Sequence, residues 1–106
     1  MQTTFARVLH LLMTLERSFG LSGLDAEQRA IFDFIVARAA EDKPPSANDI
    51  VNAKITSRSS TYRHLSALKD SGMIFDEFID GAHVMKLMPQ FSAFVEKVSD
   101  LQVTET

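Results

Sequence analysis

The segment SRSSTYRHLSALKDSGMI, residues 57–74, decides the fold that the sequence predicts. Thr61, Leu65 and Leu68 recur at the spacing of one helical face, so we expect them to pack beneath the preceding helices. The opposite face carries polar and basic side chains: Ser59, Tyr62, Arg63 and Ser66, with Ser57 and Arg58 at the start of the helix. A helix divided in this way is anchored by its apolar side and offers hydrogen-bonding groups to a partner.

The residues flanking this helix predict its ends and a hairpin behind it. Thr56 or Ser57 is the expected N-cap, and Gly72 ends the helix because glycine tolerates left-handed backbone angles. The runs MIFDEFI (73–79) and AHVMKLM (82–88) then enclose Asp80-Gly81, a strong hairpin signal. The first run does not alternate cleanly between apolar and polar residues, so it leaves the strand register open.

Two helices are expected between residues 24 and 57. Asp25 is a predicted N-cap with Gln28 as its capping-box partner, and this helix runs to about Glu41. Its predicted buried residues are Ile31, Phe32, Phe34, Ile35 and Ala39. Prolines at 44–45 prevent its continuation. Ser46 then caps the short helix SANDIVNA (46–53), with Asp49 as the capping-box acid.

Both ends of the chain carry apolar helical patterns. One pattern covers residues 3–19, and a final helix follows Pro89. The N-terminal apolar face is wide for so small a chain, which favours contact between two subunits over an ordinary core helix. The predicted dimerisation residues are Phe5, Val8, Leu9, Leu12, Leu15, Phe19, Phe94, Val98 and Leu101. The alternative, in which the terminal helices fold back on their own subunit, stays open.

Composition narrows the functional classes. The 106 residues suit one domain, and the absence of cysteine excludes thiolate metal sites and disulfides. No apolar run reaches the roughly 20 residues of a membrane span, so we expect a cytoplasmic protein. Catalytic and cofactor motifs are absent, which argues against an enzyme and against a cofactor. A metal at Asp76, Glu77, Asp80 and His83 is less favoured than a solvated hairpin.

Charge is distributed unevenly along the chain. The net charge is −3, yet residues 50–69 contain no acid. The basic residues of this window are Lys54, Arg58, Arg63 and Lys69. A positive segment on an acidic protein is the electrostatic pattern expected of a nucleic-acid contact.

Residues 46–88 resemble the winged helix-turn-helix of bacterial transcription regulators, above all the MarR type. Ser57-Arg58-Ser59-Ser60 is similar to the Ser-Arg-Ser-Thr start of that family's recognition helix, and Arg63, Leu68, Gly72 and Ile74 fall in step with it. The IclR and GntR types share part of this pattern. The resemblance implies a mainly α fold with a small β-hairpin wing. It divides the single domain into a dimerisation helix and linker (1–23), the winged helix-turn-helix (24–88) and a C-terminal dimerisation helix (89–106).

The resemblance also implies a homodimer that regulates transcription by binding specific double-stranded DNA. The helix at about 57–71 would enter the major groove. Residues implied to contact DNA are Lys54, Ser57, Arg58, Ser59, Ser60, Tyr62, Arg63, Ser66 and Lys69. Arg58 and Arg63 are the candidates for guanine edges, because a guanidinium can donate two hydrogen bonds to O6 and N7. The serines at 57, 59 and 60 and the two lysines suit phosphates.

Two departures from the family pattern keep an alternative open. Lys54-Ile55 stands where the family usually has glycine between its two motif helices. The wing carries Asp76, Glu77 and Asp80, whose charges would repel phosphates, with only His83 and Lys86 to compensate. The alternative is a winged helix that contacts another protein and binds no DNA. MarR-like proteins often bind small aromatic effectors, but the Met and Phe residues here are expected to be core.

Overall fold

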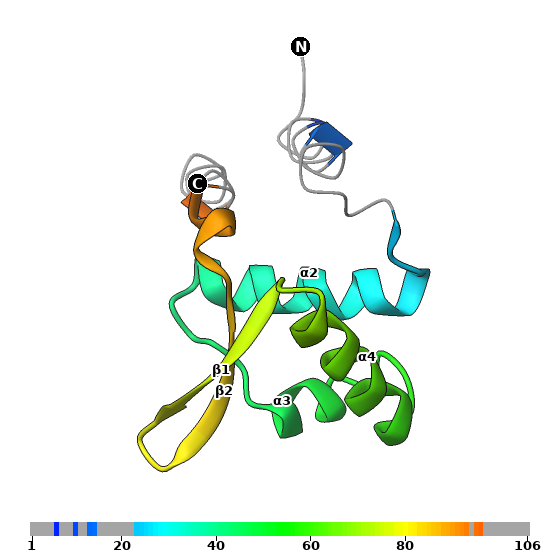
Figure 1. Ribbon diagram of the computed structural model, residues 1–106, viewed down its shortest axis with the longest axis vertical. Helices are drawn as coiled ribbons and strands as arrows, with labels where there is room; N and C mark the ends of the chain where they lie inside the picture. The colour runs from blue at the N-terminus through cyan, green and yellow to red at the C-terminus, as the bar shows by residue number, and fades with distance from the viewer. Residues whose placement is uncertain (1–5, 7–9, 11–12, 15–22, 94, 97–106) are drawn as a thin grey trace.

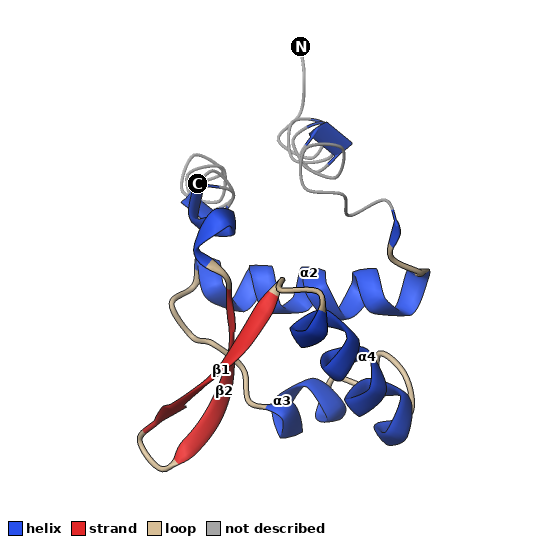
Figure 2. Ribbon diagram, viewed as in Figure 1, coloured by secondary structure: helices blue, strands red, loops and turns tan. Residues whose placement is uncertain are grey.

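The computed structural model describes residues 6, 10, 13, 14, 23–93, 95 and 96. Its elements follow in the order α2 (Ala26–Ala40), α3 (Ala47–Asn52), α4 (Arg58–Asp70), β1 (Ile74–Ile79), β2 (Ala82–Leu87) and the 3-10 turn η2 (Pro89–Phe91). In Figure 1, α2 lies across the molecule, α3 and α4 lie on one side of it, and the hairpin projects to that same side. Figure 2 shows the strands as one hairpin beside the helices. This is the predicted mainly α fold with a β-hairpin wing.

The predicted helix starts are confirmed by their caps. The Asp25 side chain accepts a hydrogen bond from the Gln28 backbone N–H at 2.8 Å. Ser46 and Asp49 form the complete capping box, at 3.1 Å and 3.0 Å. These bonds satisfy backbone N–H groups that have no partner within a helix. At the other end of α2, Asp42 takes a left-handed φ of 58° and turns the chain toward the two prolines.

The core lies where α2, α4 and the hairpin meet. Its buried side chains are Ile31, Phe32, Ile35, Val36, Ile50, Leu65, Leu68, Met73, Ile74, Met85 and Phe91. Phe34 and Ala39 were predicted to be buried and are half-buried, whereas Val36 is buried. Phe34 lies off the face formed by positions 31, 32, 35 and 36, and Ala39 lies in the last turn of α2, where fewer neighbours cover it.

The hairpin has the turn that Asp80-Gly81 predicts. Both residues have positive φ, 51° and 82°, as a type I′ turn requires. The strands pair antiparallel from Ile74 opposite Leu87 to Ile79 opposite Ala82, which settles the register that the sequence left open. The Met85 backbone N–H also donates to the Pro45 carbonyl at 2.7 Å. This bond ties the wing to the segment that begins α3.

The turn between α3 and α4 keeps a left-handed residue without glycine. Lys54 has a φ of 56°, and its backbone N–H donates to the Val51 carbonyl at 3.1 Å. A residue with a Cβ pays a steric cost of roughly 1–2 kcal/mol in this region. Lys54 therefore occupies the left-handed conformation that glycine would take in this turn.

We expect Lys54→Gly to raise the free energy of unfolding by about 0.5–1 kcal/mol, because relief of the steric cost exceeds the extra chain entropy of glycine. Urea unfolding followed by circular dichroism measures the change. Lys54→Ala is the matched control, since it removes the same charge but keeps a Cβ, and it should not stabilise the protein. A glycine variant less stable than the alanine variant would contradict the left-handed turn.

The residues predicted for dimerisation lie outside the described part of the chain: Phe5, Val8, Leu9, Leu12, Leu15, Phe19, Phe94, Val98 and Leu101. Their role stays a prediction. Within the expected helix at 3–19, the described residues Ala6, His10, Met13 and Thr14 are helical. In the described part of the protein, no helix is long and apolar enough to cross a membrane.

Candidate nucleic-acid interface

The third predicted helix, α4, divides its two faces as expected. Ser57 is its N-cap and accepts a hydrogen bond from the Ser60 backbone N–H at 3.2 Å. The buried face consists of Thr61, His64, Leu65 and Leu68. The exposed residues of α4 are Arg58, Ser59, Tyr62, Arg63, Ser66 and, at its last position, Asp70. The structure therefore brings most of the predicted contact residues together on one solvent-facing helical surface.

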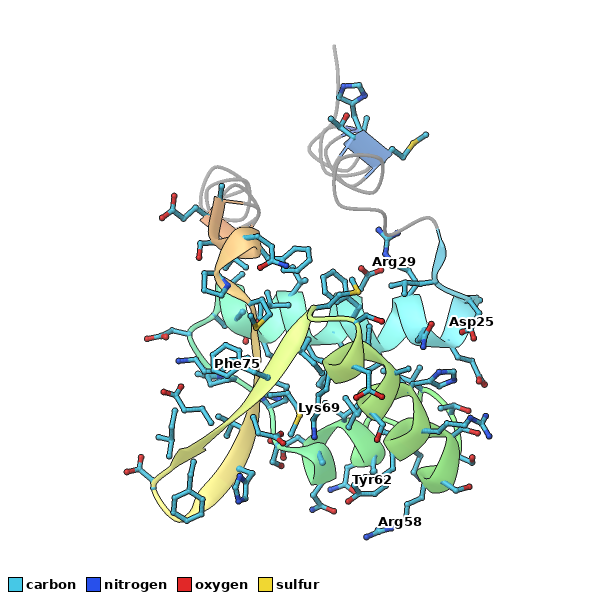
Figure 3. The ribbon with its side chains drawn as sticks, viewed as in Figure 1. Asp25, Arg29, Arg58, Tyr62, Lys69 and Phe75 are labelled. Atoms are coloured by element: carbon cyan, nitrogen blue, oxygen red, sulfur yellow. The ribbon has the colours of Figure 1, made fainter. Side chains whose placement is uncertain are left out.

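The two arginines of this surface are each held by a neighbour. The Arg58 guanidinium carbon lies 5.7 Å from the centre of the Tyr62 ring, a cation–π distance. Figure 3 places both side chains at the end of α4 that lies farthest from α2. Arg63 donates from Nη2 to the Ser60 hydroxyl at 3.2 Å. Such contacts limit the rotamers of long side chains and so reduce the entropy lost when they bind a partner.

The polar residues at the start of α4 differ in whether their side chains are available to bind a partner. The Ser57 hydroxyl is used as the cap, and the Ser57 carbonyl accepts from the buried Thr61 hydroxyl at 2.8 Å. Ser60 is half-buried, whereas Ser59 and Lys54 are exposed. A phosphate at this end of the helix would therefore meet Ser59, Lys54 and the first backbone N–H groups of α4 more readily than the Ser57 hydroxyl.

The acids of the wing are largely neutralised. Asp76 lies 2.8 Å from the Lys69 ammonium, and Glu77 lies 2.9 Å from the Lys86 ammonium. Of the three acids that were expected to repel phosphates, only Asp80 at the tip has no ion pair among the described residues. The expected repulsion between the wing and DNA phosphates is therefore smaller than the count of acids suggested.

Groups of three His, Asp or Glu side chains arranged to hold a metal ion are absent from the described residues.

The wing tip exposes an aromatic side chain. Phe78 is 64 % exposed, and its ring stacks edge-on against His83 with centres 5.0 Å apart. The two residues are opposite each other in the hairpin register. This pair gives the tip an apolar surface beside the unpaired Asp80.

His64 joins the recognition helix to α2 through a residue that the sequence analysis missed. Its ring is buried, and Nε2 lies 3.1 Å from Glu27 Oε1. The other carboxylate oxygen, Oε2, accepts from the Thr56 hydroxyl at 2.7 Å. His64 is thus a packed ring at the contact between α4 and α2. Glu27 had no distinguishing signal, because an acid in the first turn of a helix is common.

The same contacts change the acidity of Glu27. Hydrogen bonds from Thr56, then from His64, lower the pKa of Glu27 below its ordinary value of 4.5. Ionised Glu27 therefore stabilises the fold above pH 4.5, and this contribution is lost as the pH falls through the lowered pKa.

We expect Thr56→Val to raise the pKa of Glu27, because the hydroxyl that stabilises the carboxylate is gone. A titration of the Glu27 carboxyl carbon by NMR measures the shift. The matched control is Ser66→Ala, which removes an exposed hydroxyl of α4 and should leave the titration unchanged. Equal midpoints in wild type and Thr56→Val would show that the Thr56 bond does not form in solution.

Comparisons with known proteins identify the fold. No protein-family model and no curated protein sequence matches the chain. Solved structures do match it. Staphylococcus aureus MepR, in a complex with ethidium bromide, aligns with 94 % of this chain and 73 % of its own at 14 % identity and a TM-score of 0.59. Another MepR structure, described as a transcription regulator of the multidrug efflux pump MepA, aligns with 96 % of this chain and 81 % of its own at 14 % identity and a TM-score of 0.57.

Bordetella bronchiseptica BpsR, whose DNA binding is regulated by 6-hydroxynicotinic acid, is a further match. It aligns with 96 % of this chain and 70 % of its own, at 15 % identity and a TM-score of 0.54. The order of α3, α4 and hairpin agrees with the helix-turn-helix and wing expected from residues 46–88. The chain therefore has the winged helix-turn-helix fold of the MarR-like transcription regulators MepR and BpsR.

Proposed function

We propose that the protein is a sequence-specific, double-stranded DNA-binding transcription regulator that acts as a cytoplasmic homodimer. The observation that carries the proposal is the surface of α4, where Arg58, Tyr62 and Arg63 are exposed together on a segment without acids. Recognition helices place such side chains against base edges while an apolar face anchors them. The structural likeness to MepR and BpsR supports the same conclusion.

Each side chain has a role in this proposal that follows from its chemistry. Arg58 and Arg63 donate to guanine O6 and N7, while Ser59, Tyr62 and Ser66 contact base edges or sugars nearby. Lys54 and the start of α4 hold phosphates and set the register of the protein on the duplex. The ion pairs of Asp76 and Glu77 let the wing approach the backbone with less repulsion.

The proposed dimer defines the expected DNA site. In a two-fold dimer, the two α4 helices enter successive major grooves about 34 Å apart, so the operator should be a pseudo-palindrome. The apolar terminal segments, with the nine residues named above, would supply the contact between subunits. MepR was solved with ethidium, and BpsR responds to 6-hydroxynicotinic acid. These two aromatic ligands support an aromatic effector for this chain as well.

A second candidate function is contact with another protein through the wing. The observation that favours it is the exposed Phe78, because an apolar ring makes no hydrogen bond or ion pair with a DNA phosphate. Aromatic side chains are common at the centres of protein interfaces. In this alternative the arginines of α4 would be a solvated helical face.

The test is a titration of the whole protein into a library of genomic duplexes at several salt concentrations. The proposal predicts selection of a dyad sequence and an affinity that falls steeply with salt, by about 0.9 in the logarithmic slope for each phosphate neutralised. If no duplex is bound even at low salt, the DNA function is wrong. The protein-contact alternative then becomes the better explanation of the fold.

A further inference from the structure

Lys69 is occupied within its own chain. Its ammonium nitrogen lies 2.8 Å from Asp76 Oδ2, which joins the last turn of α4 to strand β1. Both side chains are partly open to water, at 36 % and 38 % exposure. An ion pair of this exposure adds little to stability. Removal of either charge should therefore leave the fold intact.

Lys69 lies on the same side of α4 as the proposed DNA-reading residues. Positions 58, 62, 66 and 69 follow one another at spacings of four, four and three, which places them along one stripe of the helix. Figure 3 shows Lys69 between α4 and the hairpin, along the helix from Tyr62 and Arg58. A free ammonium in this stripe would reach a phosphate of any duplex docked against α4. In the structure, a carboxylate oxygen of Asp76 already forms an ion pair with that ammonium.

The second ion pair of the wing lies on the other face of the hairpin. Side chains alternate between the faces of a strand, so Asp76 shares its face with the buried Ile74 and with Met85, its partner in the register. Glu77 and its partner Lys86 lie on the opposite face. The two pairs have the same chemistry and nearly the same length, but only the Asp76 pair borders α4.

We propose that Asp76 acts as an internal competitor for DNA phosphate, whose carboxylate withholds Lys69 from the duplex and so lowers the part of DNA affinity that does not depend on base sequence. The inference rests on the proposed function, because it assumes that α4 docks on DNA. Phosphate and carboxylate both offer anionic oxygens to an ammonium, so they compete for the donors of Lys69, and the charge of Asp76 cancels the attraction of Lys69 for a phosphate. The recognition surface then depends more on its arginines and less on general charge.

The first variant to compare with wild type is Asp76→Asn, an isosteric change that removes the charge. Freeing one ammonium per subunit should raise the affinity about tenfold per contact at 50 mM salt, and steepen the logarithmic salt slope by about 0.9 per contact. The gain should be equal for the selected duplex and for a scrambled one, because phosphate contacts carry no sequence information. Fluorescence anisotropy of labelled duplexes measures both quantities.

Two further variants make the result specific to the pair. Glu77→Gln makes the same change of charge on the hairpin but frees Lys86 on the face away from α4, so it should raise the affinity and the slope clearly less than Asp76→Asn does. Lys69→Ala should cancel the gain in the Asp76→Asn background. A gain that survives Lys69→Ala would overturn the proposal, since simple removal of a repelling charge would explain it.

The failure of this inference differs from the failure of the proposed function. If wild type binds duplex DNA and Asp76→Asn binds no better, only the competitor role is wrong. If neither wild type nor any variant binds a duplex at low salt, both proposals are overturned. Circular dichroism of each variant shows that the fold is kept, because none of the substituted residues belongs to the buried core.

Discussion

Replacing Arg58 and Arg63 together with alanine is expected to abolish the preference for one duplex sequence over another while the fold is retained. Both side chains are exposed on α4, and neither packs in the core. Exposed substitutions of this kind change stability by roughly 0.5 kcal/mol or less. The effect should therefore appear in binding and not in unfolding.

The expected size follows from the hydrogen bonds that are lost. Each bidentate pair between an arginine and a guanine contributes about 1–3 kcal/mol of discrimination against a wrong base. Two arginines in each of two subunits would make four such pairs. At about 1 kcal/mol for each pair, the affinity for the selected site should then fall about a thousandfold, toward the affinity for scrambled DNA. Competition binding with selected and scrambled duplexes gives this ratio directly.

The matched control is the double variant Arg58→Lys/Arg63→Lys, which keeps both positive charges. An ammonium cannot donate the two parallel hydrogen bonds of a guanidinium, and it is more strongly hydrated. Binding to scrambled DNA and its salt dependence should stay near wild type, while selection of the preferred sequence is weakened. If the double alanine variant still selects the same sequence, bases are read by another part of the protein.

The features that could be predicted from the sequence are those decided by near neighbours. The caps Asp25 and Ser46, the left-handed Gly72 and the Asp80-Gly81 turn each depend on residues within four positions. The apolar stripe of α4 also depends only on helical spacing. These signals predict the order of helices and hairpin, and the resemblance to winged helix-turn-helix regulators implied how they pack.

Other features depend on parts of the chain that meet only after folding. Glu27 and His64 are 37 residues apart, and no local pattern links them. The burial of Met85 and Ile74 shows which face of the hairpin packs on the helices, and the uneven strand sequence did not give this face. The left-handed Lys54 shows the same effect, because the positions of α3 and α4 impose a conformation that lysine alone disfavours.

The candidate site also combines a feature that could be predicted from the sequence with one that could not. Exposure of Arg58, Tyr62 and Arg63 could be predicted, because it follows from the helical period. The ion pair of Lys69 could not be predicted, because the position of its partner Asp76 depends on how the wing packs against α4. Asp76, which the sequence analysis expected to repel phosphates, is thus paired with Lys69 in the structure.

The largest expected effect on stability is that of Phe32→Ala. Phe32 is fully buried at the centre of the core, and its ring meets Phe91 edge to face, with centres 5.2 Å apart and planes at 66°. Truncation removes apolar contacts and leaves a cavity, which costs about 3–5 kcal/mol for a buried phenylalanine. A domain of this size has a stability of roughly 5–15 kcal/mol. Much of it should therefore be lost.

Urea unfolding followed by circular dichroism measures this loss, and Phe78→Ala is the matched control. The same side chain is removed there, but Phe78 is 64 % exposed, so the cost should stay below about 1 kcal/mol. Phe32→Leu keeps most of the volume and should fall between the two. If Phe32→Ala and Phe78→Ala cost the same, the contact between α2 and η2 is not the centre of the core. The orientation of α4, which packs against α2, would then lack its support.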